Sequence, residues 1–312
     1  MRFIIDTDIG DDIDDAFAID MALNLKLDLV GITTVYMNTD QRTRIAKRML
    51  DLYGIDIPVY KGYGCNMDGK KPTDQQLCQF SQAIMSDCYR PNSDPQDAVD
   101  FILYNARKYG KDLTIIAIGP LTNIAKAVLQ DKAAMQGIGK IVIMGGDYKN
   151  QYSEWNILCD IDAAKIVFEA DLPMVCFGHE LTSRTQITQT QQDYIFKMDS
   201  SPYLEYLSEL SRLWYASKKT GHLIILHDVL TVYCMYDKDY CKTVKTLVKI
   251  EDKGEITKGM TVNLSVMDHY DLRKAHMIEY AVCDNVETFK DIFYKLLKER
   301  KVGSDDYEKA IN

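Results

Sequence analysis

The chain has 312 residues, of which 46% are apolar, and a formal net charge of -9. This length and apolar content suffice to bury one large core, and the acidic balance argues against nucleic acid as a partner. No apolar run approaches the roughly 18 residues of a membrane span, and we expect no signal peptide. The eight cysteines are scattered, so we expect free thiols in a cytoplasmic protein rather than disulfides or a zinc site.

Short apolar segments alternate with amphipathic ones along most of the chain. Strands are predicted at residues 3–5, 29–36, 57–60, 113–118, 141–144, 174–177, 246–250, 259–266 and 278–282. Helices are predicted at residues 16–25, 40–52, 96–109, 161–169, 228–236 and 284–300, after residue 123 and within 185–219. Continuous apolar strands followed by helices are typical of a mostly parallel sheet covered on both faces. We therefore expect a single α/β domain over residues 1–312, built on an open, doubly wound, Rossmann-like sheet.

Residues 61–94 interrupt this alternation. The stretch mixes polar and aromatic residues with glycines and prolines, and it shows no clear period. Long loops inside compact domains are usually lids or binding loops. We interpret the stretch as an excursion over the functional site, with a short helix near residues 74–88.

An acidic turn follows the first strand. Asp6 ends the strand, Gly10 breaks it, and further aspartates stand at positions 8, 11, 12, 14 and 15. Like charges a few ångströms apart oppose each other's ionisation, and a bound cation relieves this; oxygen-only ligands favour Ca²⁺ or Mg²⁺. The cluster also follows a strand's carboxyl end, where open α/β sheets bind ligands. The alternative is a solvated acidic loop in which Asp12 or Asp14 caps the next helix.

Two later segments carry polar residues suited to a site. If Glu154-Trp155-Asn156 is extended, Glu154 and Asn156 point to the same side and Trp155 faces away. His227-Asp228 opens an apolar helix. A lone histidine at such a position is more often a structural residue, and a lone aspartate at a helix start is more often a cap.

The segment from Asp6 to Gly10, followed by Asp14-Asp15-Ala16, resembles the signature of the inosine–uridine-preferring nucleoside hydrolases. Ile9 stands where the commoner form has proline, and the Asp-Asp-Ala comes two residues later, as in the branch with the longer acidic loop. Residues 117–123 resemble the family's Gly-Pro-Leu-Thr-Asn turn, and residues 154–156 its Glu-aromatic-Asn motif. His227-Asp228 also matches a family motif.

The resemblance implies the nucleoside hydrolase fold and Ca²⁺-dependent cleavage of ribonucleosides, which are small-molecule substrates, to free base and ribose. The implied metal ligands are Asp8, Asp15, Asp228 and the Ile118 carbonyl, with Asp12 or Asp14 in reserve. Asp8 would be the general base and His227 the proton donor to the leaving base. The implied substrate contacts are Asp14, Asn38, Glu154, Asn156 and Asp228. The resemblance further implies a homodimer or homotetramer.

Two family features are missing. Tyr148 stands where many members carry an asparagine six residues before the glutamate, and no histidine precedes His179, so the family's histidine-bearing base loop is absent. Side chains in and next to the excursion could contact a base, although core packing or oligomer contacts explain them equally well: Tyr60, Tyr63, Met67, Phe80 and Tyr89. We expect His179, His269 and His276 to be structural and leave His222 open.

Other functions stay open from the sequence. A phosphatase of the haloacid-dehalogenase type also begins with a strand ending in D-x-D, but Ile9-Gly10 and Glu154-Trp155-Asn156 fit it poorly. A metal-dependent ribose or nucleoside binder would keep the sugar site without catalysis. A hydrolase of another N-ribosyl compound would differ in its leaving group.

Overall fold

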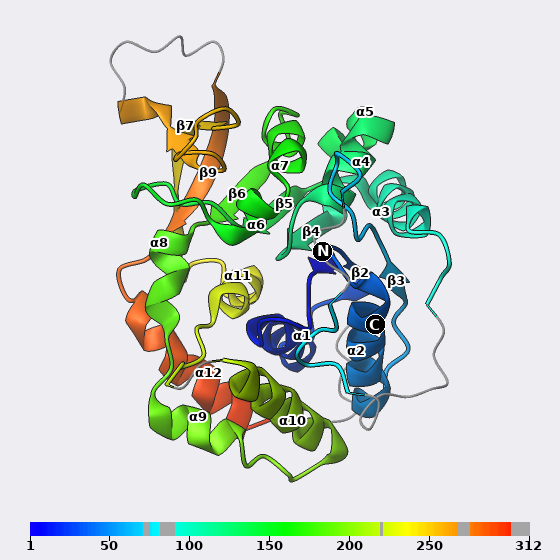
Figure 1. Ribbon diagram of the computed structural model, residues 1–312, viewed down its shortest axis with the longest axis vertical. Helices are drawn as coiled ribbons and strands as arrows, with labels where there is room; N and C mark the ends of the chain where they lie inside the picture. The colour runs from blue at the N-terminus through cyan, green and yellow to red at the C-terminus, as the bar shows by residue number, and fades with distance from the viewer. Residues whose placement is uncertain (71–74, 82–90, 219–220, 267–274, 301–312) are drawn as a thin grey trace.

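The computed structural model describes residues 1–70, 75–81, 91–218, 221–266 and 275–300. Over these residues the chain forms a nine-stranded sheet with the order β3-β2-β1-β4-β5-β6-β9-β7-β8 (Figure 1). The strands are β1 (Arg2–Thr7), β2 (Leu29–Thr34), β3 (Val59–Lys61), β4 (Leu113–Ala117), β5 (Lys140–Met144), β6 (Met174–Phe177), β7 (Lys242–Ile250), β8 (Thr261–Asn263) and β9 (His276–Val282). In this spatial order, neighbouring strands from β3 as far as β9 are parallel to each other. β7 is antiparallel to both of its neighbours, β9 and β8. The predicted mostly parallel sheet is confirmed.

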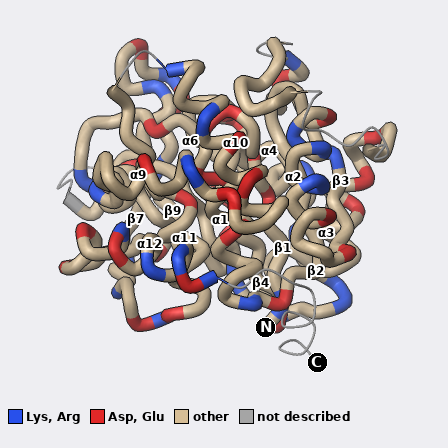
Figure 2. Tube along the Cα trace, turned by 90° about the horizontal axis from the view of Figure 1, so that it is seen from below, with Lys and Arg blue, Asp and Glu red and all other residues tan. Residues whose placement is uncertain are grey.

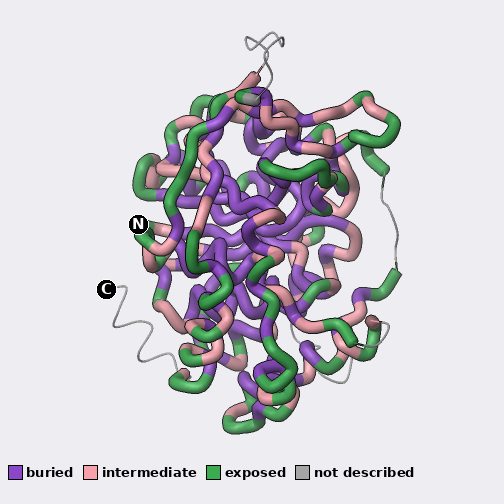
Figure 3. Tube along the Cα trace, turned by 90° about the vertical axis from the view of Figure 1, so that its left-hand side faces the viewer, coloured by how far each residue is buried: buried purple, intermediate pink, exposed green. Residues whose placement is uncertain are grey.

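Helices cover both faces of the sheet. In β1, Phe3 and Ile5 pack on one face and Ile4 on the other, because successive side chains of a strand point to opposite sides. The first face carries α1 (Asp14–Asn24), α2 (Thr39–Tyr53), α9 (Gln189–Ile195), α10 (Pro202–Ser217), α11 (His227–Tyr236) and α12 (Phe289–Lys298). The second face carries α3 (Gln96–Tyr109), α4 (Thr122–Gln130), α5 (Lys132–Gly137) and α7 (Ile161–Phe168). Buried residues accordingly fill the middle of the molecule (Figure 3).

The strand order reverses between β1 and β4. β1 pairs with β2 on one side and with β4 on the other, so the chain leaves these strands in opposite directions. Open α/β sheets bind ligands in the crevice outside the strands' carboxyl ends at such a point. Asp8 follows β1 and Ile118 follows β4, so both lie at this crevice.

Two local predictions have a different outcome. Residues 154–156, predicted to be extended, begin the short helix α6 (Trp155–Cys159), because the Glu154 carboxylate accepts the N–H groups of Asn156 and Ile157 and caps it. Of the short helix predicted near residues 74–88, the described part, residues 75–81, contains no helix, and the rest lies outside the described residues. No helix in the described parts of the chain is long and apolar enough to cross a membrane.

Candidate active site

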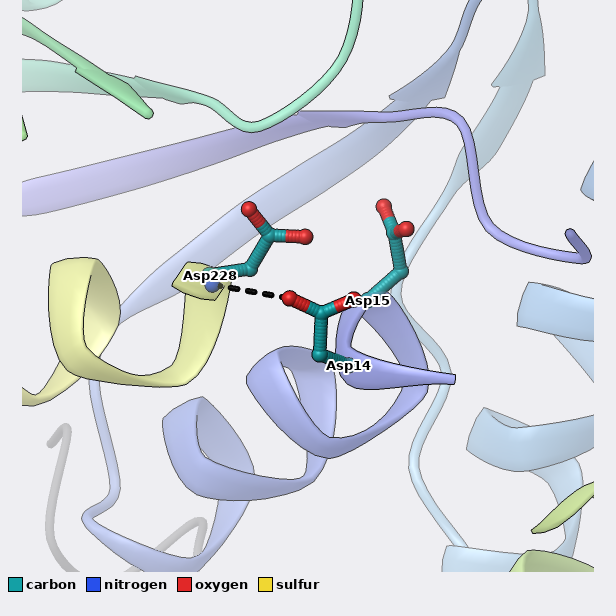
Figure 4. A group of neighbouring side chains, drawn as sticks. All are labelled: Asp14, Asp15 and Asp228. Atoms are coloured by element: carbon teal, nitrogen blue, oxygen red, sulfur yellow. Dashed lines mark hydrogen bonds between the residues drawn. The ribbon is translucent and has the colours of Figure 1, made fainter. Parts of the chain in front are cut away.

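The acidic turn after β1 delivers two aspartates to the start of α1. Gly10, with φ 125°, adopts a conformation that L side chains rarely reach, and it turns the chain from strand toward helix. Asp14 and Asp15 are the first two residues of α1, Asp228 is the second residue of α11, and all three are buried. One carboxylate oxygen from each lies within 4.8 Å of the others. Figure 4 shows the three side chains close together, Asp14 and Asp15 from α1 and Asp228 from α11. We call these three residues the aspartate triad.

Burial makes the aspartate triad costly to ionise. It raises the pKa of Asp14, Asp15 and Asp228, and repulsion from neighbouring aspartates adds to each shift. The solvated-loop alternative does not hold for Asp14 and Asp15, because both are buried and Ile13 occupies the N-cap position without a side-chain cap. Acidic residues gather at the start of α1 near the centre of the view in Figure 2. Three carboxylates without a softer donor suit Ca²⁺ or Mg²⁺.

The aspartate triad borders a cavity of about 570 Å³. Asp8, Asp12 and Ile118 line the same cavity, so the structure brings together all the residues predicted to ligate the metal. Asp14, in reserve as a ligand from the sequence, is a member of the triad, whereas Asp8 and Asp12 are not. Burial raises the pKa of Asp8 to about 6. The cavity's volume is typical of small-molecule sites.

The turn after β4 approaches the acidic turn closely. A Cβ atom at Gly119 would lie 2.9 Å from both the backbone nitrogen and Oδ1 of Asp8, so no larger residue fits there without a shift. The N–H of Ile118 donates to the Asp6 carbonyl oxygen at 2.8 Å. The carbonyl oxygen of Ile118 accepts the Asn156 side-chain amide at 3.2 Å. These contacts fix the Ile118 carbonyl beside Asp8.

Arg42 organises the acidic turn, and the sequence analysis missed it. Its guanidinium is fully buried and donates to the carbonyl oxygens of Tyr36 at 2.7 Å, Ile9 at 3.0 Å and Asp8. It also donates to the Asp11 carboxylate at 2.9 Å. Its charge opposes the rise in the pKa of Asp8 that burial causes. Arg42 therefore both shapes the turn and partly neutralises it.

The Glu-aromatic-Asn segment faces the cavity with all three of its side chains. The buried Glu154 carboxylate accepts the N–H groups of Gly146 at 3.0 Å, Asn156 at 2.9 Å and Ile157 at 3.2 Å, and burial raises its pKa to about 7. Trp155 was expected to face away, but it lines the cavity with 58% of its surface exposed. The helical conformation explains the error, because successive residues of a helix are not on opposite sides.

Asn38, a predicted ribose contact, and Tyr148, at the position of the family's asparagine, have other partners. The Asn38 side chain accepts the N–H of Gln41 at 3.4 Å and caps α2, and it does not line the cavity. Tyr148 is buried, its ring stacks on Tyr280 with centroids 5.3 Å apart, and its hydroxyl donates to the Gly145 carbonyl oxygen at 3.1 Å. Tyr148 therefore does not replace the family's asparagine as a polar group in the cavity.

A column of three aromatic rings forms one wall of the cavity. Tyr152 stacks on His179 with centroids 4.2 Å apart, and His179 on His227 at 5.7 Å. Nδ1 of His227 lies 2.8 Å from Oγ1 of Thr182, and burial lowers the pKa of His227 to about 3. His179, expected to be structural, is therefore a cavity residue. Of the other histidines, His222 is exposed away from the cavity, His276 lies 3.7 Å from Asp171, and His269 is outside the described residues.

Part of the 61–94 excursion covers the acidic turn. The Gln79 side chain donates to the Asp12 carbonyl oxygen at 2.5 Å, and the Cys78 thiol to that of Asp11 at 3.2 Å. Residues 75–78 line the cavity. Of the side chains that the sequence offered as possible base contacts, Tyr60, Tyr63, Met67 and Phe80 do not line the cavity, and Tyr89 is outside the described residues.

Known proteins resemble this chain over most of its length. The family described as "Inosine-uridine preferring nucleoside hydrolase" matches residues 3–291. "Uridine nucleosidase 1" from Arabidopsis thaliana is 29% identical over 283 residues, which cover 86% of this chain and 82% of that protein. "Pyrimidine-specific ribonucleoside hydrolase RihA" from Enterobacter sp. (strain 638) is 30% identical over 294 residues, covering 87% and 89% of the two chains.

Solved structures agree with these matches. "Plant nucleoside hydrolase - PpNRh1 enzyme" has a TM-score of 0.80 and 27% identity, covering 97% of this chain and 99% of its own. "Purine-Preferring Ribonucleoside Hydrolase from Gardnerella vaginalis" has a TM-score of 0.77 and 27% identity, covering 96% and 98%. The chain therefore belongs to the inosine-uridine preferring nucleoside hydrolase family, whose members cleave N-glycosyl bonds.

Proposed function

We propose that this protein is a calcium-dependent hydrolase of the N-glycosidic bond of ribonucleosides, with pyrimidine nucleosides such as uridine among its substrates. The aspartate triad carries the proposal, since three buried carboxylates beside a ligand-sized cavity need a cation to be stably ionised. The names of two relatives, a uridine nucleosidase and a pyrimidine-specific hydrolase, support a pyrimidine base.

The carboxylates around the cavity have two roles, metal binding and proton transfer. Asp14, Asp15 and Asp228 would hold Ca²⁺, with Asp8 and the Ile118 carbonyl beside them. When bound, the ion would polarise the ribose hydroxyls and lower the pKa of a water molecule. Asp8 would be the general base that accepts a proton from the water whose oxygen bonds to the anomeric carbon.

The remaining polar groups act on the ribose and the base. Asp228, Glu154 and Asn156 bind ribose hydroxyls, and nearby carboxylates stabilise the positive charge that develops on the ring in an oxocarbenium-like transition state. The departing base needs a proton. Two histidines line the cavity and are available as donors: His227, which the family motif favours, and His179, which the structure adds.

Ribose release tests the proposal. Purified protein is stripped with a chelator, supplied with Ca²⁺ or Mg²⁺, and assayed with uridine and inosine. We expect chelation to abolish ribose release from uridine and Ca²⁺ to restore it. Uridine binding without ribose release would favour the nucleoside-binding alternative, and release that survives complete removal of metal would refute the role of the cation.

A further inference from the structure

We propose that His179 donates the proton to the leaving base, an assignment that rests on the proposed function. Two neighbouring strand ends place His179 beside Asp147. β5 and β6 pair in parallel with Met144 opposite Phe177, and Asp147 and His179 follow these residues at the same edge of the sheet. The N–H of His179 donates to the Gly146 carbonyl oxygen at 2.8 Å, which fixes the start of α8 (His179–Thr182) next to Asp147.

Asp147 is a buried carboxylate held in one orientation. Its side chain is 1% exposed. Oδ1 accepts the N–H groups of Lys149 at 3.1 Å and Asn150 at 2.7 Å, and Oδ2 accepts the Asn150 side-chain amide at 3.1 Å. Oδ2 also lies 3.7 Å from Nδ1 of His179, so the pair forms an ion pair when the imidazole is protonated.

This pairing orients the imidazole of His179. With Nδ1 turned toward Asp147, Nε2 is the ring nitrogen left for a substrate, and the side chain is 32% exposed where it lines the cavity. A carboxylate beside one ring nitrogen of a histidine favours one orientation of the ring, which is the role of the aspartate in the catalytic triads of hydrolases. The ring of Tyr152 stacks on His179 with an interplanar angle of 22° and limits its rotation.

His227 has a different setting, although it lines the same cavity. Its Nδ1 contacts the neutral hydroxyl of Thr182 at 2.8 Å. Among the contacts of the described residues, Nδ1 of His179 faces a carboxylate, whereas Nδ1 of His227 faces a hydroxyl group. His227 therefore supports the neighbouring ring of His179 through their stack.

The proton balance of the step is complete. As the bond between the anomeric carbon and the base nitrogen breaks, its electron pair moves to the base, and the proton on Nε2 of His179 passes to the base. The attacking water forms the new carbon–oxygen bond and gives one proton to Asp8. The products are neutral base and ribose, Asp8 then releases its proton to solvent, and His179 regains one from solvent.

Leaving-group dependence tests this assignment. The substrates are uridine, whose base leaves poorly without a proton, and 4-nitrophenyl β-D-riboside, whose phenolate leaves without one. We compare wild type with His179→Gln, His227→Gln and His276→Gln in the full chain with Ca²⁺. His276 is a matched control, because its Nδ1 also lies 3.7 Å from an aspartate oxygen, of Asp171, but it does not line the cavity. Melting temperatures report on folding.

We expect His179→Gln to lower kcat/KM for uridine by at least about 100-fold, the ordinary contribution of general acid catalysis, and the rate with the nitrophenyl riboside to stay within about threefold. His276→Gln should change neither rate. Equal losses on both substrates in His179→Gln would overturn the assignment, and so would the selective loss in His227→Gln alone. A wild-type protein that releases ribose from neither substrate would refute the proposed function itself, and the assignment with it.

Discussion

The backbone N–H of Asp228 donates to the carboxylate of Asp14 at 3.1 Å, and this hydrogen bond joins the first turns of α11 and α1 (Figure 4). Both helices begin at the aspartate triad, so their N-terminal dipoles favour negative charge there. The pKa of Asp228 is nevertheless raised, because burial and the neighbouring Asp14 and Asp15 outweigh the helix ends. A cation would remove this remaining cost.

The stability of the metal-free protein should therefore depend on pH. Burial raises the pKa of the aspartate triad above the ordinary value near 3.8, and that of Asp8 to about 6, so the folded state keeps protons that the unfolded chain has lost. Stability should fall as the pH rises from about 4 through about 6. Calcium replaces these protons, so the increase in Tm on adding calcium should be larger at about pH 7.5 than at about pH 5.5.

Scanning calorimetry with chelator or calcium at each pH measures this difference. His227 acts in the opposite direction, because burial lowers its pKa to about 3 and the unfolded chain takes up the proton that the folded state excludes. Its effect is common to both metal conditions and largely cancels in the calcium-dependent shift. An equal shift at both pH values would contradict the prediction.

Gly119→Ala, in the turn after β4, should lower activity by displacing Asp8. The added Cβ would meet the backbone nitrogen and Oδ1 of Asp8 at 2.9 Å, so Asp8 must move. We expect kcat/KM to fall at least about tenfold, because small displacements of catalytic groups are costly, and stability to fall by about 1–3 kcal/mol. Gly137→Ala is the control, since nothing lies within 4 Å of its Cβ position. Similar activities in the two variants would refute the close approach.

Arg42→Met should loosen the acidic turn. The substitution leaves the carbonyl oxygens of Tyr36, Asp8 and Ile9 without their buried donor, and we expect a loss of about 3–5 kcal/mol in the free energy of unfolding. Calcium affinity should also decrease. Arg44→Met, two residues further along α2, removes a half-exposed pair with Asp40 and should cost about 1 kcal/mol or less. Denaturant titrations measure the free energy of unfolding of both variants, and equal losses would contradict the role given to Arg42.

Trp155→Ala tests whether this ring contacts the substrate. Stacking of a base on an aromatic ring contributes about 1–3 kcal/mol, so kcat/KM for uridine should fall roughly 10- to 100-fold. The ring is 58% exposed, so Tm should hardly change. Tyr104→Ala removes an equally exposed ring outside the cavity and should leave kcat/KM unaltered. If the two variants behave alike, Trp155 does not contact the base.

The sheet was predictable because its parallel strands are buried on both faces and read as continuous apolar runs, as in β4, where Ile115 packs on one face and Ile116 on the other. The acidic turn was predictable because aspartates so crowded after a strand are unusual. The full length and antiparallel pairing of β7 were not predictable in this way. Its first four residues are exposed, so only the part from Thr246 onward has the pattern of a buried strand.

The missed features depend on contacts distant in sequence. Arg42 had a signal: it shares the buried face of α2 with Ile45, Ala46 and Met49, and a charge on an apolar stripe needs partners. His179 had none, because its pairing with Asp147 exists only once β5 and β6 lie side by side.

Calcium titration of the metal-free protein tests the central claim most directly. Calorimetry is performed on wild type, Asp228→Asn and the control Asp162→Asn, an exposed aspartate in the first turn of α7. We predict one calcium per chain in wild type and the control, binding at least about 10- to 100-fold weaker in Asp228→Asn, and slower uridine hydrolysis by Asp228→Asn that requires correspondingly higher calcium. Unchanged calcium affinity in Asp228→Asn, or full hydrolysis by metal-free wild type, would contradict the account.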